Sequence, residues 1–183
     1  MQNLINDLLA YSRTNVTERK FENSDLNKIV REVMAALKEE LQEKKATIEM
    51  GKLCDANIIP FQFRQLLQNL IANSLKFSKP DVAPHIIINS DYVEYDALND
   101  IKFQGETDYC HISISDNGIG FEPKYNDRIF EIFQRLHDKE VYEGTGIGLT
   151  IVRKIVENHN GIITASGKLG EGSTFDIFIP SQK

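Results

Sequence analysis

Apolar and polar residues alternate along the chain with two periods, one typical of helices and one of strands. A repeat of three to four residues predicts a helix, and a repeat of two predicts a strand. The expected helices cover 26–43, 61–77, 126–136 and 147–159, and the expected strands cover 46–52, 85–95, 109–115, 162–167 and 173–179. Because helices and strands follow one another irregularly, the pattern predicts an α+β fold. We expect a two-layer α/β sandwich, in which helices cover one face of a mixed sheet.

The beginning of the chain differs from the rest. Residues 1–13 carry a helical apolar stripe that starts without a capping residue, and 14–24 are mostly polar. We interpret the stripe as the end of a longer helix and the polar stretch as a linker. A free amphipathic helix that packs on its own domain is the alternative. The expected division is 1–20 for the helix end and linker, and 21–183 for the folded domain.

Composition narrows the classes of function. The 183 residues carry a formal net charge of −6, which argues against a basic surface that binds nucleic acid. Cys54 and Cys110 are far apart in the sequence and lack metal-site spacing, so we expect two free thiols and a reducing compartment. No stretch is apolar enough to span a bilayer or to form a signal peptide, so the expected location is cytoplasmic.

The predicted helix at 61–77 carries a polar strip beside its apolar face. Asn69, Asn73 and Lys76 fall within roughly 60° of one another at helical spacing. An amide oxygen suits Mg²⁺, and a lysine ammonium can neutralise a phosphate oxygen. A solvated polar face would produce the same strip, so this helix alone leaves both interpretations open.

Two glycine-containing segments add candidate chemistry. Asp116 ends a predicted strand and can accept a hydrogen bond from an amine such as that of adenine, while Gly118 and Gly120 allow a flat ring to approach the backbone. An ordinary Asp-Asn-Gly turn is the alternative. The segment 143–149 reads E-G-T-G-I-G-L and opens a helix, whose N-terminus can bind phosphate. It is neither a P-loop nor a dinucleotide-binding fingerprint.

These segments occur in a specific order: N-x-x-x-N-x-x-K-F, D-N-G-I-G-F, F-x-x-F, G-T-G-I-G-L and G-S-T-F. In this order they resemble the catalytic ATP-binding domain of bacterial sensor histidine kinases, a member of the GHKL superfamily. The resemblance covers nearly the whole chain. It implies the Bergerat-type ATP-binding fold, with ATP and Mg²⁺ as ligands.

The resemblance also implies individual roles. Asn73 would coordinate Mg²⁺, with Asn69 supporting it, and Lys76 would contact the phosphates. Asp116 would accept from the adenine amine. Arg135 would reach the γ-phosphate from a mobile lid. The lid would be anchored by Phe130 and Phe133 and would also carry His137 and Lys139. The other residues implied in ATP binding are Phe77, Gly118, Ile119, Gly120, Gly144, Thr145, Gly146, Ile147, Gly148, Leu149 and Thr174, the last touching adenine indirectly.

One position separates a kinase from a hydrolase. Hydrolytic members of the superfamily, such as DNA gyrase, carry a water-activating glutamate one helical turn before the metal-binding asparagine. This chain has Asn69 there, and an amide cannot serve as a base at neutral pH. The resemblance therefore indicates phosphoryl transfer to histidine, with Asn69, Lys76 and Arg135 as the catalytic residues. A clamp-like or chaperone-like ATPase and a degenerate nucleotide-binding scaffold are the alternatives.

The phosphate acceptor is expected outside this chain. The family places its histidine on an upstream dimerising hairpin, and none of His85, His111, His137 and His159 lies in such a segment. Residues 1–13 resemble the last turns of that hairpin. The implied partners are the hairpin histidine, in a homodimeric full-length protein, and a response regulator. The helix end is too short to require this chain to dimerise. Any membrane anchor would lie upstream.

Two departures from the family pattern remain. Ser74 replaces the alanine that usually follows the metal-binding asparagine, and we expect little effect because serine is also small. An acidic insertion covers 96–108, and its purpose does not follow from the sequence.

Overall fold

The computed structural model describes residues 20–94, 108–131 and 146–181. Its α-helices are α2 (Leu26–Ala36), α3 (Lys38–Glu43), α4 (Pro60–Lys76) and α5 (Gly148–Asn158), and its 3₁₀ turns are η2 (Pro123–Tyr125) and η3 (Arg128–Phe130). The strands are β1 (Glu22–Asp25), β2 (Thr47–Met50), β3 (Asp55–Ile58), β4 (His85–Val93), β5 (Tyr109–Asp116), β6 (Ile162–Lys168) and β7 (Gly172–Pro180). Within these ranges, no helix has both the length and the apolar character needed to cross a membrane.

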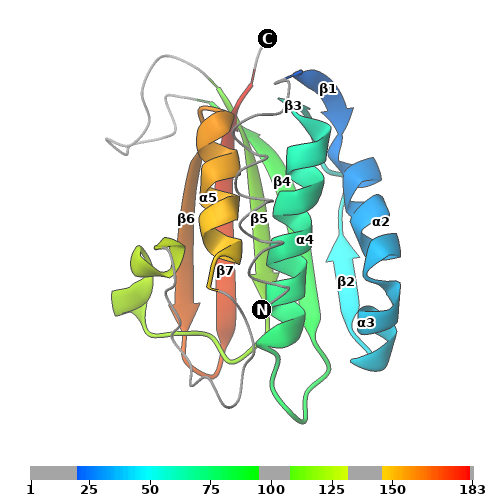
Figure 1. The fold of residues 1–183 in the computed structure, drawn as a ribbon, viewed down its shortest axis with the longest axis vertical. Coiled ribbons are helices and arrows are strands. Elements are labelled where there is room, and N and C mark those ends of the chain that lie inside the picture. Colours follow the sequence, from blue (N-terminus) through cyan, green and yellow to red (C-terminus); the bar gives the residue numbers. More distant parts are fainter. Residues whose placement is uncertain (1–19, 95–107, 132–145, 182–183) are drawn as a thin grey trace.

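The main sheet is mixed and has the strand order β2-β4-β5-β7-β6. β2 runs parallel to β4, and the other neighbouring strands are antiparallel. The long helices α2, α4 and α5 lie side by side in front of this sheet (Figure 1). This arrangement confirms the predicted α+β sandwich.

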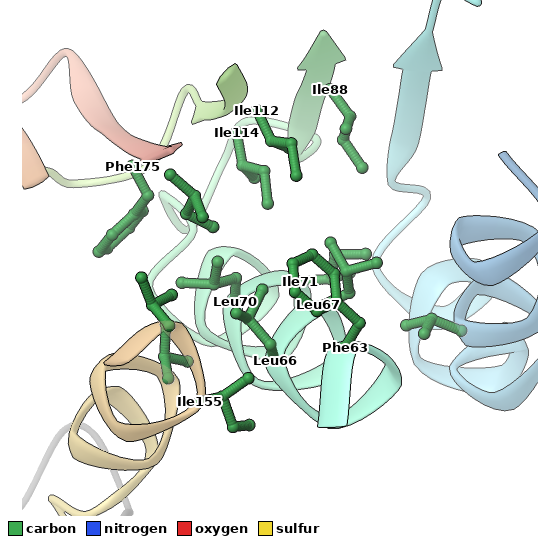
Figure 2. Close-up of a cluster of buried hydrophobic side chains, with 14 of the residues drawn as sticks. Phe63, Leu66, Leu67, Leu70, Ile71, Ile88, Ile112, Ile114, Ile155 and Phe175 are labelled. Carbon is green, nitrogen blue, oxygen red and sulfur yellow. The ribbon is translucent and has the colours of Figure 1, made fainter. Parts of the chain in front are cut away.

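The core lies between α4 and the sheet. The apolar face of α4 points toward the side chains of β4, β5 and β7, and α5 closes the cluster from one side (Figure 2). Ile88, Ile112 and Ile114 supply the sheet side, and each is at most 2% exposed. The α4 residues in this cluster are Phe63, Leu66, Leu67, Leu70 and Ile71. Because α4 is held along its whole length, the polar strip on its flank has a fixed direction.

The structure corrects three expected elements. The helix predicted at 26–43 is interrupted at Leu37, which has φ −98° and ψ 15°, so α2 and α3 are separate. The predicted linker ends in β1, which pairs antiparallel with β3, and neither strand was predicted. Both are only four residues long, which is too short for a clear periodic signal. β1 is polar throughout, whereas β3 buries Ala56 and Ile58 on one face.

The helix predicted at 126–136 is also wrong where the structure describes it. The chain makes the short turns η2 and η3 up to Glu131. The adjacent residues Ile129 and Phe130 are both buried, and Phe130 packs edge-on against Phe175 with ring centroids 6.4 Å apart. Two adjacent anchors fit a tight turn better than a helix, which buries residues three or four apart. The rest of the predicted helix lies outside the described residues.

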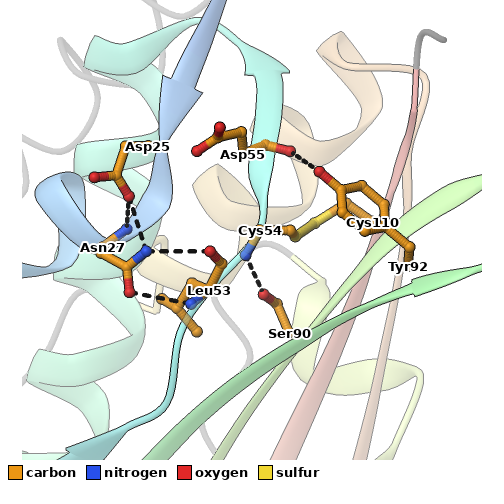
Figure 3. The surroundings of a disulfide bond; sticks show 8 residues. All are labelled: Asp25, Asn27, Leu53, Cys54, Asp55, Ser90, Tyr92 and Cys110. Atoms are coloured by element: carbon orange, nitrogen blue, oxygen red, sulfur yellow. Dashed lines mark hydrogen bonds between the residues drawn. A yellow bond between two sulfur atoms is a disulfide. The ribbon is translucent and has the colours of Figure 1, made fainter.

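The expectation of free thiols is wrong. Cys54 and Cys110 form a disulfide between the segment that precedes β3 and the start of β5 (Figure 3). The backbone N–H of Cys54 donates to Ser90 Oγ of β4 at 2.7 Å, and Tyr92 pairs in register with Cys110. The two cysteines are 56 residues apart in sequence, so only the tertiary fold brings them together. The expected reducing compartment rested on free thiols, so the disulfide removes the basis for that expectation.

The same region is fixed to the start of α2. Asn27 exchanges two hydrogen bonds with the backbone of Leu53, at 3.0 and 3.1 Å (Figure 3). Asp25 caps α2 by accepting from the Asn27 N–H at 2.8 Å. A hydrogen bond from the Asn27 side chain is the main cause that lowers the pKa of the Asp25 carboxyl. These contacts join β1, α2 and the connection before β3 into one corner of the fold.

Candidate nucleotide-binding site

The polar strip of α4 lies where the sequence predicts it. Asn69, Asn73 and Lys76 are all partly exposed, while the neighbouring apolar residues are buried. Asn69 Nδ2 donates to the carbonyl of Gln65 at 3.0 Å. The amide oxygen of Asn69 faces the first residue of α5, since a Cβ added to Gly148 would lie 3.2 Å from it. The structure therefore brings the polar strip of α4 to the N-terminus of α5.

The Asn73 side chain is available for a ligand. Among the described residues, no hydrogen bond to the Asn73 side-chain amide occurs, and its backbone carbonyl accepts from Phe77 N at 2.9 Å. Lys76 Nζ lies 4.7 Å from the centroid of the Phe77 ring. An uncommitted amide oxygen and a nearby ammonium fit the needs of a hydrated Mg²⁺ and a phosphate.

Asp116 ends β5 and is held by three donors. Its Oδ1 accepts from Gly118 N at 2.8 Å, and its Oδ2 accepts from Ser173 Oγ at 2.6 Å. Ser74 Oγ of α4 lies 3.2 Å from the same Oδ2. A carboxylate has about four acceptor positions, so at least one remains for a donor on a base edge.

The loop after Asp116 is tied to the end of α4. Ile119 N donates to the carbonyl of Phe77 at 2.9 Å, and Gly170 N donates to the carbonyl of Ile119 at 2.8 Å. Gly120 has φ +64°, and a Cβ there would collide with the carbonyl of Lys168. The backbone therefore passes closely between α4 and the β6–β7 turn, as the predicted glycine loop requires.

Gly118 gives a prediction that tests this close passage. A Cβ at Gly118 would lie 2.6 Å from Phe77 O and 2.8 Å from Asp116 Oδ1. We expect Gly118→Ala to displace the Asp116 carboxyl and to weaken ATP binding roughly tenfold or more, which nucleotide titration measures. Gly51→Ala is the control, because its Cβ would approach no atom closer than 4.0 Å. Unchanged ATP affinity in the folded Gly118→Ala protein would contradict the prediction.

The N-terminus of α5 forms the other side of the site. Gly146 has φ +72°, Ile147 is 3% exposed, and Gly148 starts the helix without a side-chain cap. Uncapped N–H groups and the positive end of the helix dipole favour an anion here. Leu149 is half-buried and packs against the core. Thr150 Oγ1 donates to the carbonyl of Phe130 at 3.2 Å, so α5 also holds the start of the predicted lid.

The remainder of the predicted lid lies outside the described residues. It comprises Phe133, Arg135, His137, Lys139, Gly144 and Thr145. The role of Arg135 toward the γ-phosphate and the roles of Gly144 and Thr145 stay predictions.

Ser173, which sequence reasoning did not single out, supplies a hydroxyl next to Asp116, and Thr174 does not. Thr174 pairs in register with Ser115, and their hydroxyl oxygens are 2.9 Å apart. Because side chains alternate across a strand, Ser173 shares the Asp116 side of the sheet and Thr174 lies on the other side. An indirect contact of Thr174 with adenine stays a prediction.

Sequence reasoning also missed the contact of Ser74 with Asp116. Ser74 follows Leu67 and Ile71 at helical spacing, so it belongs to the buried face of α4, and it is 4% exposed. This spacing was a usable signal, because a hydroxyl buried on a core face needs a hydrogen-bond partner.

Three histidines lie in the described ranges, and each is engaged. His85 Nε2 is 3.0 Å from Glu49, and His111 Nε2 is 2.8 Å from Asp176. His159 is 3% exposed; its Nε2 accepts from Ile59 N at 2.9 Å, and its Nδ1 lies 2.7 Å from the Ile155 carbonyl. These contacts agree with the expectation that the histidines are structural or surface residues.

Comparison with known proteins identifies the family. The profile described as "Histidine kinase-, DNA gyrase B-, and HSP90-like ATPase" matches residues 59–183. The chain belongs to this family. The match begins just before α4 and includes both glycine loops, so the ATPase-family domain contains every site residue discussed above.

The relatives extend the likeness to the N-terminal residues. The chain is 39% identical to cyanobacterial phytochrome A of Nostoc sp. over 98% of its length, and this covers 22% of that protein. It is 33% identical to the uncharacterized sensor-like histidine kinase ycf26 of Porphyra purpurea over 94% of its length, covering 27% of that protein. The chain thus spans about a quarter of the length of these curated relatives.

A solved structure agrees on the fold. A crystal structure of full-length ShkA in complex with AMPPNP superposes with a TM-score of 0.72 at 23% identity. The match covers 98% of this chain and 36% of ShkA. The family match and the relatives, rather than this superposition, make residues 59–183 an ATP-binding domain of the histidine kinase type.

Proposed function

We propose that the chain binds Mg-ATP and transfers the γ-phosphoryl group to a histidine on a helical hairpin upstream of it. Asn69 is the single observation that carries this proposal. It stands one helical turn before Asn73, and its Nδ2 is committed to Gln65 O, so it offers no base to activate water. Phosphoryl transfer needs mainly positioning and charge neutralisation, so it can proceed without such a base when the acceptor is itself nucleophilic.

Recognition of the nucleotide is divided between the two ends of the site. Asp116 accepts a hydrogen bond from the adenine amine, and Phe77 packs against the base or ribose. Gly118, Ile119 and Gly120 shape the walls of the adenine pocket. The contacts of Asp116 with Gly118 and Ser173 support this role, because they hold a part-buried carboxylate in one orientation.

The phosphates lie between α4 and α5 in this proposal. Asn73 holds Mg²⁺ through its amide oxygen, with Asn69 beside it, and Lys76 neutralises a phosphate. When bound, Mg²⁺ supplies charge neutralisation at the phosphoryl oxygens. The segment from Gly146 to Leu149 presents the N-terminus of α5 to the phosphates. Arg135 reaches the γ-phosphate from the lid.

The transfer step itself is a substitution at phosphorus. A neutral imidazole nitrogen of the acceptor attacks the γ-phosphorus, and the bond from that phosphorus to the bridging oxygen breaks. ADP leaves with the electron pair of that bond, and the other ring nitrogen of the imidazole releases its N–H proton to solvent. The engaged histidines of the described residues support an acceptor outside this chain.

The partners follow from the same chemistry. We propose that the phosphohistidine passes its phosphoryl group to an aspartate of a response regulator, and that the full-length protein is a homodimer. The histidine kinase ycf26 and the other relatives are far longer than this chain, which supports further domains. We propose a cytoplasmic location because ATP is supplied there. In that compartment, the local redox conditions determine whether Cys54 and Cys110 are joined.

The proposed transfer is tested by following labelled phosphate from ATP to the acceptor hairpin. The chain is mixed with Mg²⁺, γ-labelled ATP and a separately produced acceptor hairpin from the upstream part of the same protein. We expect acid-labile label on the hairpin, and none when its histidine is replaced by glutamine. Steady release of phosphate without labelled hairpin would instead support an ATPase of the clamp or chaperone type. Mg²⁺-dependent ATP binding with neither labelled hairpin nor released phosphate would support a degenerate nucleotide-binding scaffold. Absence of any Mg²⁺-dependent ATP binding would refute the proposal.

A further inference from the structure

Ser74 is a buried hydroxyl that connects α4 to the carboxylate at the end of β5. It is 4% exposed, and its Oγ lies 3.2 Å from both Leu70 O and Asp116 Oδ2. A serine hydroxyl has one hydrogen, so the two acceptors share it. The backbone carbonyl of Leu70 belongs to the same helix, whereas Asp116 belongs to the sheet.

The Asp116 carboxylate is therefore held from two layers. Ser173 donates to Oδ2 from β7 at 2.6 Å, and Ser74 approaches the same oxygen from α4. Gly118 N occupies one position of Oδ1 at 2.8 Å. With Oδ2 engaged by two hydroxyls, the remaining acceptor position belongs to Oδ1.

We propose that Ser74 is a positioning residue that orients Asp116 toward the exocyclic amine of the base and so favours a 6-aminopurine. This inference rests on the proposed binding of ATP. A carboxylate only accepts hydrogen bonds, so its preference for adenine depends on where its free lone pair points. Ser74 immediately follows Asn73, so the same helical turn orients both the base subsite and the proposed metal ligand. This role concerns the hydroxyl of Ser74, whereas the expectation of little effect rested on the size of the side chain alone.

The test compares two nucleotides that differ only in the amine. ATP and purine riboside 5′-triphosphate, which lacks the 6-amino group, are titrated with Mg²⁺ against the native protein and Ser74→Ala. We expect Ser74→Ala to weaken ATP binding roughly threefold to tenfold, the effect of losing one ordinary hydrogen bond, because the Ser74 hydrogen is shared between two acceptors. The affinity of Ser74→Ala for purine riboside triphosphate should equal that of the native protein, because this base has no amine that could donate a hydrogen bond to Asp116.

Ser78→Ala is the matched control. Ser78 lies just after the same helix; its Oγ donates to Leu75 O at 2.8 Å and accepts from Lys44 Nζ at 3.2 Å. Among the described residues, the side-chain and backbone donors to the Asp116 carboxylate are Gly118, Ser74 and Ser173. Ser78→Ala should change the affinity neither for ATP nor for purine riboside triphosphate. Ser173→Ala removes the 2.6 Å donor and should weaken ATP binding with the same selectivity for the amine. Thermal melting of each variant establishes that it is folded.

The outcomes separate this inference from the proposed function. Equal weakening of both nucleotides by Ser74→Ala would show a merely structural hydroxyl and overturn the inference alone. Unchanged ATP binding would also overturn it alone. If the native protein bound neither nucleotide, the proposed function would fail and the inference would fail with it.

Discussion

Replacing Asn73 with alanine is expected to abolish phosphoryl transfer to the acceptor hairpin, with a loss of roughly a hundredfold or more. The substitution removes the only proposed metal-ligating oxygen, and neutralisation of the phosphates by a metal contributes several kcal/mol to such reactions. The fold should persist, because Asn73 is only partly buried and alanine is the best helix former. The labelled-phosphate assay measures the loss, and the Mg²⁺ dependence of ATP binding locates its cause.

Gln68→Ala provides a matched control for Asn73→Ala. Gln68 is an exposed amide on α4 and is not part of the polar strip. We expect this variant to transfer phosphate at the native rate and to bind Mg-ATP normally. Native transfer by Asn73→Ala would place the Mg²⁺ ligand elsewhere and would refute the assigned role.

Opening the disulfide is expected to produce the largest change in stability. Cys54 and Cys110 are 56 residues apart. A cross-link that closes a loop of that size lowers the entropy of the unfolded chain and thereby stabilises the folded state by about 4 kcal/mol. For a domain of this length, that corresponds to a fall in melting temperature of roughly 10 °C. Calorimetry of the native protein with and without a reductant measures the difference.

Cys54→Ser supplies the control for reduction. Cys54 is half-buried, so serine is tolerated better there than at Cys110, which is 1% exposed. The variant should melt near the temperature of the reduced native protein and should not respond to the reductant. If the native protein melted at one temperature in both conditions and two thiols titrated without reduction, the disulfide would be absent in solution.

Local sequence patterns predicted most of the fold. The face of α4 from Phe63 to Ile71 and the alternation in β4, β5 and β7 are local signals, because a buried face repeats with the period of its element. The break at Leu37 and the polar strand β1 lacked such a signal, and the alternation in β3 covers only four residues. Short strands depend on pairing with a distant segment, and periodicity within either strand does not report that pairing.

In the candidate site, too, the residues with a local sequence signal were the ones that the sequence predicted. Asn69, Asn73 and Lys76 follow from helical spacing, and Asp116 and Gly118 follow from a motif after a strand. The family match at 59–183 confirms that these motifs belong to one ATP-binding domain. Their individual roles, and that of Arg135 outside the described residues, await the experiments above.

The sequence by itself determined the class of fold, the ATP-binding motifs and the amide at Asn69 on which the proposal of phosphoryl transfer rests. Only the tertiary structure decided that Ser74 and Ser173 hold the Asp116 carboxylate, and that Cys54 reaches Cys110. The physical reason is that local spacing fixes which face of an element is buried. Which side chains meet across the buried faces depends on strand order and register, and these are set by the packing of the whole domain.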